Sequence, residues 1–233
     1  MSAPDGTRPG SPPGRDADAA HDTPSPDSLR TALEAALTPV AASWLGAAEE
    51  MVRASSGEIA ALFPAAGRAC GRGPLPGLPG WTVADAARAL LLLAVPADGD
   101  RRLTETLACY RYGEASERLA VLRSLPLLGL GPAAIGLTED ALRTHDARLL
   151  AAAVGPYAAR HLDQSLWRHA VLKCLFTDVP LTAVAALHDR CDARLLRMLG
   201  DLVREREAAG RAAPPDAVAL IAAHDRRSLD QEW

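Results

Sequence analysis

The chain has 233 residues and a formal net charge of −4 at pH 7, which lacks the basic footprint of a nucleic-acid-binding protein. Aromatic residues make up only 4% of the sequence, and the prevalence of alanine, leucine and arginine favours helices over a β sandwich or barrel. The longest apolar run, residues 89–96, is too short to span a bilayer, and no basic-then-apolar leader opens the sequence. We therefore expect a cytoplasmic all-α protein without membrane insertion.

Residues 1–25 are rich in Pro, Gly, Ser and Asp and show no apolar periodicity. Such a segment buries too little surface to offset chain entropy, so we predict a disordered tail. Ser25 followed by Pro26 is typical of a helix start, with an N-cap and a proline in the first turn. We predict a single helical domain over residues 26–224 and a frayed end over residues 225–233.

The middle of the chain alternates helical patterns with turn residues. Residues 67–80 contain glycines and prolines without the order of a phosphate-binding loop, and predict an irregular loop. Thr82 and Asp85 have the spacing of a capping box that opens a helix over residues 83–95. The same reasoning predicts helices over residues 101–112, 114–125 and 193–209.

Residues 157–181 contain the most informative stretch. Asp163 is a candidate N-cap for a helix over residues 164–176, whose apolar side chains cover a wide arc, with Leu166 and Trp167 among them. His169 and Lys173 share the narrow polar face, and Lys173 is the only lysine among 25 lysines and arginines. Lys173 is interpreted either as a snorkelling side chain or as a cation that binds an anionic or carbonyl ligand.

A weak internal similarity suggests stacking of helices. Residues 120–125 resemble residues 170–175, and residues 146–150 resemble residues 192–196. These offsets are near those of helical repeats, and predict stacked antiparallel helical pairs in an open or HEAT/armadillo-like α-solenoid. Coincidence in a chain rich in Ala, Leu and Arg is the competing explanation.

Catalytic and metal motifs with specific spacing, such as G-x-S-x-G, H-E-x-x-H or C-x-x-C, do not occur. Cys109 and Cys174 lie in apolar helical contexts and are expected to be inert core thiols. The pairs at residues 145–146 and 188–189 are His-Asp, as in a helical metal-dependent hydrolase of the HD type. Aspartate is also a common cap at helix ends, so we expect no metal and no cofactor.

Several motifs follow one another over residues 157–211. They consist of Tyr157, Trp167, Leu172, Lys173, Leu175, Phe176, Pro180, Leu181, Glu205, Arg206 and residues 208–211. In this order they resemble the EboA family, which typically has a W-x-x-x-V-L-K-x-L-F core, a P-L turn and an E-R-W-A-A-G-R run. Two positions depart from this pattern: Arg168 stands where a polar amide is expected, and Glu207 where tryptophan is expected.

The resemblance implies a cytoplasmic helical partner in a bacterial gene cluster that moves or matures a secondary metabolite. Other members of such clusters resemble a prenyltransferase, a TatD-like hydrolase, a dehydroquinate-synthase-like enzyme and a sugar-isomerase-like barrel. We expect a non-enzymatic factor that binds a small molecule or a partner protein. The alternatives are an HD-type hydrolase using His145, Asp146, His188 and Asp189, and a purely structural scaffold. The candidate ligand- or partner-binding residues are Tyr157, Trp167, His169, Lys173 and Arg206.

Overall fold

The computed structural model describes residues 23–230, and over this range the protein is all-α, as its composition predicted. The one β-type pairing within the range is an isolated bridge between Pro74 and Thr82. The predicted tail falls almost wholly outside it. The α-helices are α1 (Pro26–Ala36), α2 (Pro39–Ala54), α3 (Ile59–Ala69), α4 (Val83–Ala94), α5 (Arg101–Tyr112), α6 (Ala115–Ser124), α7 (Ile135–Ala141), α8 (Ala147–Ala153), α9 (Pro156–His161), α10 (Gln164–Phe176), α11 (Leu187–Arg190), α12 (Ala193–Ala208) and α13 (Pro215–Asp230).

Local side-chain caps start the helices where the sequence predicted them. The hydroxyl of Ser25 accepts a hydrogen bond from the backbone N–H of Ser28 at the start of α1. Thr82 and Asp85 form both bonds of the predicted capping box at α4, at 3.1 and 3.2 Å. Asp163 accepts two backbone N–H bonds at the start of α10. Each cap satisfies N–H groups that the first helical turn leaves without a partner.

Helix α3 runs further than the sequence predicted. The glycine-rich segment was expected to be a loop from residue 67, but α3 continues through Gly67 and ends at Ala69. Gly67 is buried, and a Cβ atom built on it would lie 3.2 Å from Nε of Arg72. The glycine therefore serves close packing inside a helix rather than a turn.

Helix α4 is the centre of the larger hydrophobic core. Every residue of α4 except Leu93 is buried, because α1, α2, α3, α5 and α6 all pack against it. A helix surrounded in this way is mostly apolar on all sides, although the charged residues Asp85 and Arg88 of α4 are buried as well. The run of four leucines at residues 90–93 supplies that surface.

A second core surrounds α10 and contains Trp167, which is fully buried. The two cores meet at α8, where Leu149 belongs to the first and Leu150 to the second. Consecutive residues of a helix point about 100° apart, so α8 can contribute to both. Burial of these apolar surfaces is the main contribution to stability.

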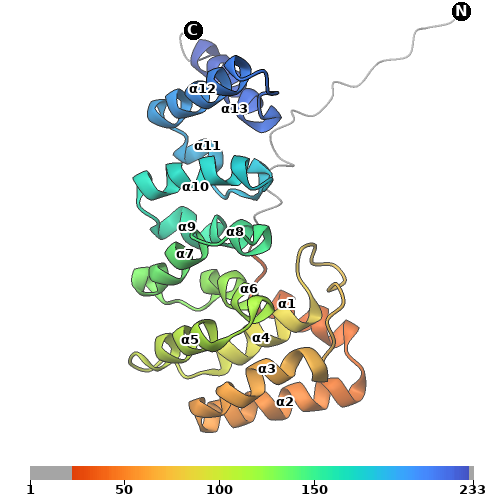
Figure 1. The fold of residues 1–233 in the computed structure, drawn as a ribbon. Coiled ribbons are helices and arrows are strands. Elements are labelled where there is room, and N and C mark those ends of the chain that lie inside the picture. The colour runs from red at the N-terminus through yellow and green to blue at the C-terminus, as the bar shows by residue number, and fades with distance from the viewer. Residues whose placement is uncertain (1–22, 231–233) are drawn as a thin grey trace, which may run out of the picture.

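The helices are layered along one direction, with α2 and α3 at one end and α12 and α13 at the other (Figure 1). The similar sequence segments lie in α6 and α10, and at the starts of α8 and α12. A regular solenoid of helical pairs stays a prediction. Among the described residues, no helix combines the length and apolar character needed to cross a membrane.

Candidate functional site

The five predicted site residues lie in different environments. Trp167 is fully buried in the second core. The guanidinium carbon of Arg190 lies 4.9 Å from the ring centroid of Trp167, in a cation–π contact. The indole N–H of Trp167 has no hydrogen-bond partner among the described residues. Trp167 therefore contributes to packing rather than to an exposed surface.

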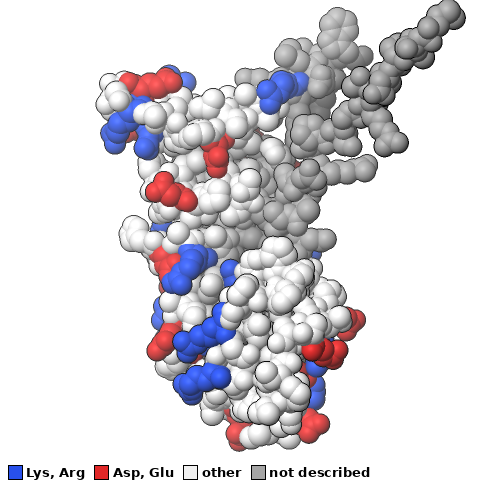
Figure 2. Space-filling model, turned by 90° about the vertical axis from the view of Figure 1, so that its right-hand side faces the viewer, with Lys and Arg blue, Asp and Glu red and all other residues white. Residues whose placement is uncertain are grey.

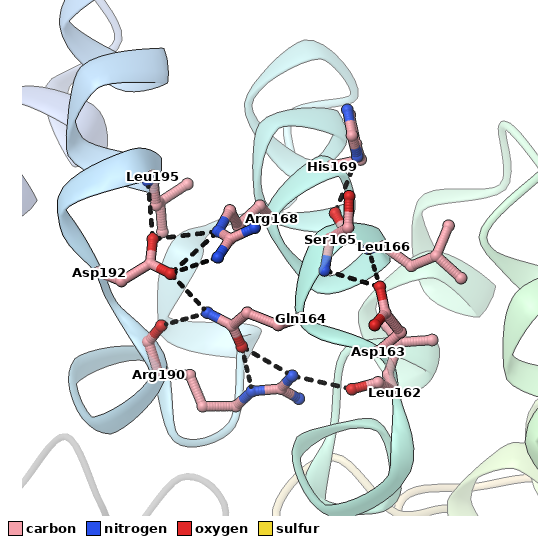
Figure 3. Close-up of polar contacts among 10 residues, drawn as sticks. All are labelled: Leu162, Asp163, Gln164, Ser165, Leu166, Arg168, His169, Arg190, Asp192 and Leu195. Carbon is pink, nitrogen blue, oxygen red and sulfur yellow. Dashed lines mark hydrogen bonds and ion pairs between the residues drawn. The ribbon is translucent and has the colours of Figure 1, made fainter.

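Arg168 links α10 to the start of α12 (Figure 3). Its guanidinium pairs with the carboxylate of Asp192, with nitrogen–oxygen distances of 3.0 and 2.5 Å. The amide of Gln164 donates to the same carboxylate at 3.1 Å. The hydrogen bonds from Arg168 hold the pKa of Asp192 well below its usual range. The arginine that departs from the family pattern thus fixes two helices together.

Arg190, at the end of α11, closes the same network on its other side (Figure 3). It donates to the carbonyl oxygens of Ala158, Ala159 and Leu162 at 2.8–3.1 Å and to the amide oxygen of Gln164. These carbonyls lie at the end of α9 and at its C-cap Leu162, where most carbonyls lack intrahelical partners. The carbonyl of Ala158 also accepts from the N–H of Leu162 at 2.9 Å. The guanidinium of Arg190 therefore caps the C-terminal end of α9 and also lies over the ring of Trp167.

Lys173 and His169 occupy the polar face of α10, as predicted, and each contacts a different backbone carbonyl. Lys173 is half-buried, and its ammonium donates to the carbonyl of Leu142 at 2.5 Å. His169 is exposed, and its Nδ1 lies 2.8 Å from the carbonyl of Ser165. Leu166, which belongs to the predicted apolar arc, is 44% exposed, so the arc is less buried than expected. Phe176, at the end of α10, is 63% exposed.

Tyr157 and Arg206 belong to separate parts of the molecule. The Tyr157 hydroxyl donates to the carbonyl of Gly131 at 2.5 Å and accepts from the N–H of Ala134 at 3.2 Å. Burial raises the pKa of this phenol. Arg206 lies in α12, and its Nε is buried without a partner among the described residues.

Tyr157 lines a groove of about 540 Å³. Its walls come from residues 23–24, the turn at residues 79–81, the end of α6, the face of α8, the start of α9 and residues 178–183. The loop between α3 and α4 projects beside α6 and α8 and brings the turn into place (Figure 1). Trp167, His169, Lys173 and Arg206 are not among its lining residues.

The wall at residues 178–183 is held by unusual backbone geometry and by two hydrogen bonds. Asp178, the first residue of the wall, and Ala186, three residues beyond its end, have φ angles of 55° and 54°. Aspartate tolerates this left-handed region, whereas alanine is rare there. The N–H of Leu181 donates to the carboxylate of Asp216 at 2.8 Å, and that of Ala185 to the carbonyl of Val154 at 3.0 Å. The wall is therefore fixed to α8 and α13.

Two arginines supply positive charge to the groove. Arg123 pairs with Asp85 at 2.5 Å, and the side chains are 26% and 5% exposed. Arg148 pairs with Asp146 at 2.8 Å and is 67% exposed. Hydrogen bonding by Arg148 lowers the pKa of the Asp146 carboxyl. Asp178, which is exposed, adds a negative charge on the wall at residues 178–183.

Sequence reasoning did not single out Trp81, Arg123 or Arg148 as site residues, although all three line the groove. One signal pointed toward Arg123. It occupies the position that corresponds to Lys173 in the similarity between residues 120–125 and 170–175. The groove itself joins segments about a hundred residues apart, which no local pattern could bring together.

The His-Asp pairs are used differently from a metal site. Asp146 caps α8 by accepting from the N–H of Arg148 at 2.9 Å. His188 and Asp189 are exposed on α11. Among the side chains that the structure describes, no group of three or more His, Cys, Asp or Glu residues could hold a metal ion.

The surface seen from the right-hand side of Figure 1 carries charges of both signs (Figure 2). Basic and acidic groups alternate along its left edge, and a broad uncharged area covers much of its lower half. Such a mixed distribution favours recognition by individual side chains over attraction by one extended field of a single sign.

The comparisons with known proteins give one match. The model of a family described as metabolite traffic protein EboA matches residues 69–222, which is more than half of the chain. The matched residues include all of the residues that line the groove except Thr23 and Pro24. No curated protein and no solved structure matches the chain.

Proposed function

Because the chain belongs to the EboA family of metabolite traffic proteins, we propose that it binds a small organic metabolite in the groove lined by Tyr157 and carries it without converting it. The family description supports a role in metabolite traffic. The groove supports the more specific proposal that a small molecule is the cargo.

The size and lining of the groove carry this proposal. Its volume of about 540 Å³ lies within the range of about 300–1,000 Å³ that is typical of small-molecule sites. Trp81, Leu122, Pro126 and Val179 provide apolar contact surface. A few polar groups among apolar walls are the usual composition of a site that orients an organic ligand.

The predicted site residues receive different parts in this proposal. Tyr157 is the candidate contact residue, because it lines the groove while its hydroxyl is held by Gly131 and Ala134. We propose that Trp167 and Lys173 act as positioning residues, since α10 leads directly into the wall at residues 178–183. His169 and Arg206 stay candidate ligand- or partner-binding residues.

Titration with the neutral fluorescent probe N-phenyl-1-naphthylamine tests the proposal. Ala151→Phe places a large side chain in the groove, and Thr182→Phe does so at its exposed rim. Ala47→Phe adds the same side chain to an exposed position of α2 and is the matched control. We expect both groove variants to weaken probe binding at least tenfold and the control to bind as wild type does. Equal binding by all four folded proteins would reject the groove as the site.

A further inference from the structure

The lining of the groove contains a cation with unused hydrogen-bonding capacity. Arg123 donates through Nη1 to Asp85. A guanidinium has five N–H donors in a planar fork, and among the described residues the structure gives Nε and Nη2 of Arg123 no partner. Its side chain is 26% exposed and lines the groove. Arg123 is therefore held in place by one bond while donors remain for a ligand.

Asp85 fixes the position of this arginine. The carboxylate is 5% exposed and accepts both from Arg123 and, at 3.2 Å, from the backbone N–H of Thr82. The same residue closes the capping box of α4, the most buried helix of the fold. A guanidinium that is anchored by a rigid buried partner loses little side-chain entropy when it binds a second anion.

Apolar surface lies beside the cation. Trp81 precedes the capping box by one residue and lines the groove together with Leu122, the neighbour of Arg123 in α6. Tyr157, which is 5% exposed, belongs to the same lining, and its hydroxyl is already engaged with the backbone. Trp81 and Tyr157 therefore offer mainly apolar contact, and Arg123 offers charge.

We propose that the ligand of the groove is an amphipathic organic anion, whose carboxylate or phosphate pairs with Arg123 while its apolar body packs against Trp81 and Tyr157. This inference rests on the proposed function and specifies its ligand class. Arginine suits this task because its planar fork binds carboxylate and phosphate oxygens in pairs. Arg148 is a less constrained second cation, since it is exposed at the rim.

A pair of fluorescent probes with nearly the same aromatic body tests the charge requirement. 1-Anilinonaphthalene-8-sulfonate carries an anionic group, and N-phenyl-1-naphthylamine lacks it. Arg123→Gln should weaken binding of the sulfonate probe about tenfold, the loss expected for one charge-assisted interaction, and change binding of the neutral probe less than about twofold. Arg197→Gln, on an exposed position of α12, is the matched control and should change neither.

Variants of Asp85 separate binding from folding. Asp85→Asn keeps an oxygen for Thr82 and Arg123 but removes the negative charge, so the sulfonate probe should bind about threefold more tightly. The double variant Asp85→Asn/Arg123→Gln leaves no buried carboxylate unpaired, and should bind the sulfonate probe as weakly as Arg123→Gln. Unchanged or weaker binding by folded Asp85→Asn would contradict the assignment.

Competition distinguishes an amphipathic anion from a simple anion. Decanoate should displace the sulfonate probe, whereas decanol and inorganic phosphate should displace it only at far higher concentrations. Displacement by phosphate alone would reduce the site to a simple anion site and overturn the ligand class. If Ala151→Phe weakens binding of the neutral probe, but Arg123→Gln weakens binding of both probes equally, the groove is a ligand site and only the assignment of the charge to Arg123 fails.

Discussion

The only lysine of the chain, Lys173, donates a hydrogen bond from its ammonium to the carbonyl oxygen of Leu142 at 2.5 Å. Leu142 is the C-cap residue of α7, so the cation lies where a helix presents carbonyls without intrahelical partners. This bond connects α10 of the second core with the end of α7.

Lys173→Met should lower the stability of the protein more than its ligand binding. Loss of a charged donor to a partly buried carbonyl should cost about 1 kcal/mol, which corresponds to a fall in Tm of roughly 2–4 °C for a domain of this size. Thermal unfolding measures the effect, and Lys173→Arg is the control that retains a donor. A folded Lys173→Met with wild-type Tm and lost probe binding would instead support a ligand-binding lysine.

Arg190→Met should destabilise the protein more strongly. The substitution leaves the carbonyls of Ala158, Ala159 and Leu162 without this donor and removes the cation from the face of Trp167. We expect a loss of about 2–3 kcal/mol, seen as a decrease in the urea midpoint of unfolding. Arg194→Met, at an exposed position of α12, should change stability by less than about 0.5 kcal/mol. Equal effects would show that the network around Arg190 contributes nothing specific.

The ion pair between Arg168 and Asp192 should make stability depend on acid pH. Because the pKa of Asp192 is lowered in the folded protein, its contribution is complete above its unfolded pKa of about 3.9 and declines as the pH falls toward the folded pKa. Asp192→Asn retains an acceptor for the N–H of Leu195. Its Tm should lie below that of wild type at pH 7, and the difference should shrink below about pH 4. A constant difference would exclude the ion pair as the cause.

Cys109 and Cys174 should not react with thiol reagents in the native protein. Both are buried, and burial raises the pKa of each thiol to about 12, so almost no thiolate forms near neutral pH. Titration with a chromogenic disulfide reagent should give the same native reaction for wild type and for Cys109→Ala/Cys174→Ala. The two proteins should differ by two thiols only after unfolding in guanidinium chloride. A smaller native reaction for the variant would show that these thiols are accessible.

The local features of the fold could be predicted from the sequence because their determinants are close in the chain. Asp163 and the pair Thr82 and Asp85 contact N–H groups only two or three residues away. The end of α5 and the start of α6 follow from Gly113, which lies between the two helices. The exposure of Leu166 and Phe176 could not be predicted, since it depends on which helices lie beside α10 rather than on the pattern of α10 itself.

The groove required the structure because its walls are distant in sequence. Trp81 and Tyr157 line one cavity, and only the folded arrangement of α6, α8 and the loop before α4 brings them together. The motif residues were candidates for ligand or partner binding, with a snorkelling alternative for Lys173; in the structure Trp167 is buried and Lys173 bonds the carbonyl of Leu142. The family resemblance rested on motif residues, whereas the contacts of each side chain determine whether it packs or faces the groove.

Occupancy of the groove is tested most directly by native mass spectrometry of the protein purified from its own cells. We predict that wild type and Ala47→Phe carry one small organic anion in addition to the chain of 24.4 kDa, and that Ala151→Phe carries none. A wild-type protein that is folded and has only the mass of the chain, alone or with another protein attached, would contradict a metabolite carrier and favour a scaffold.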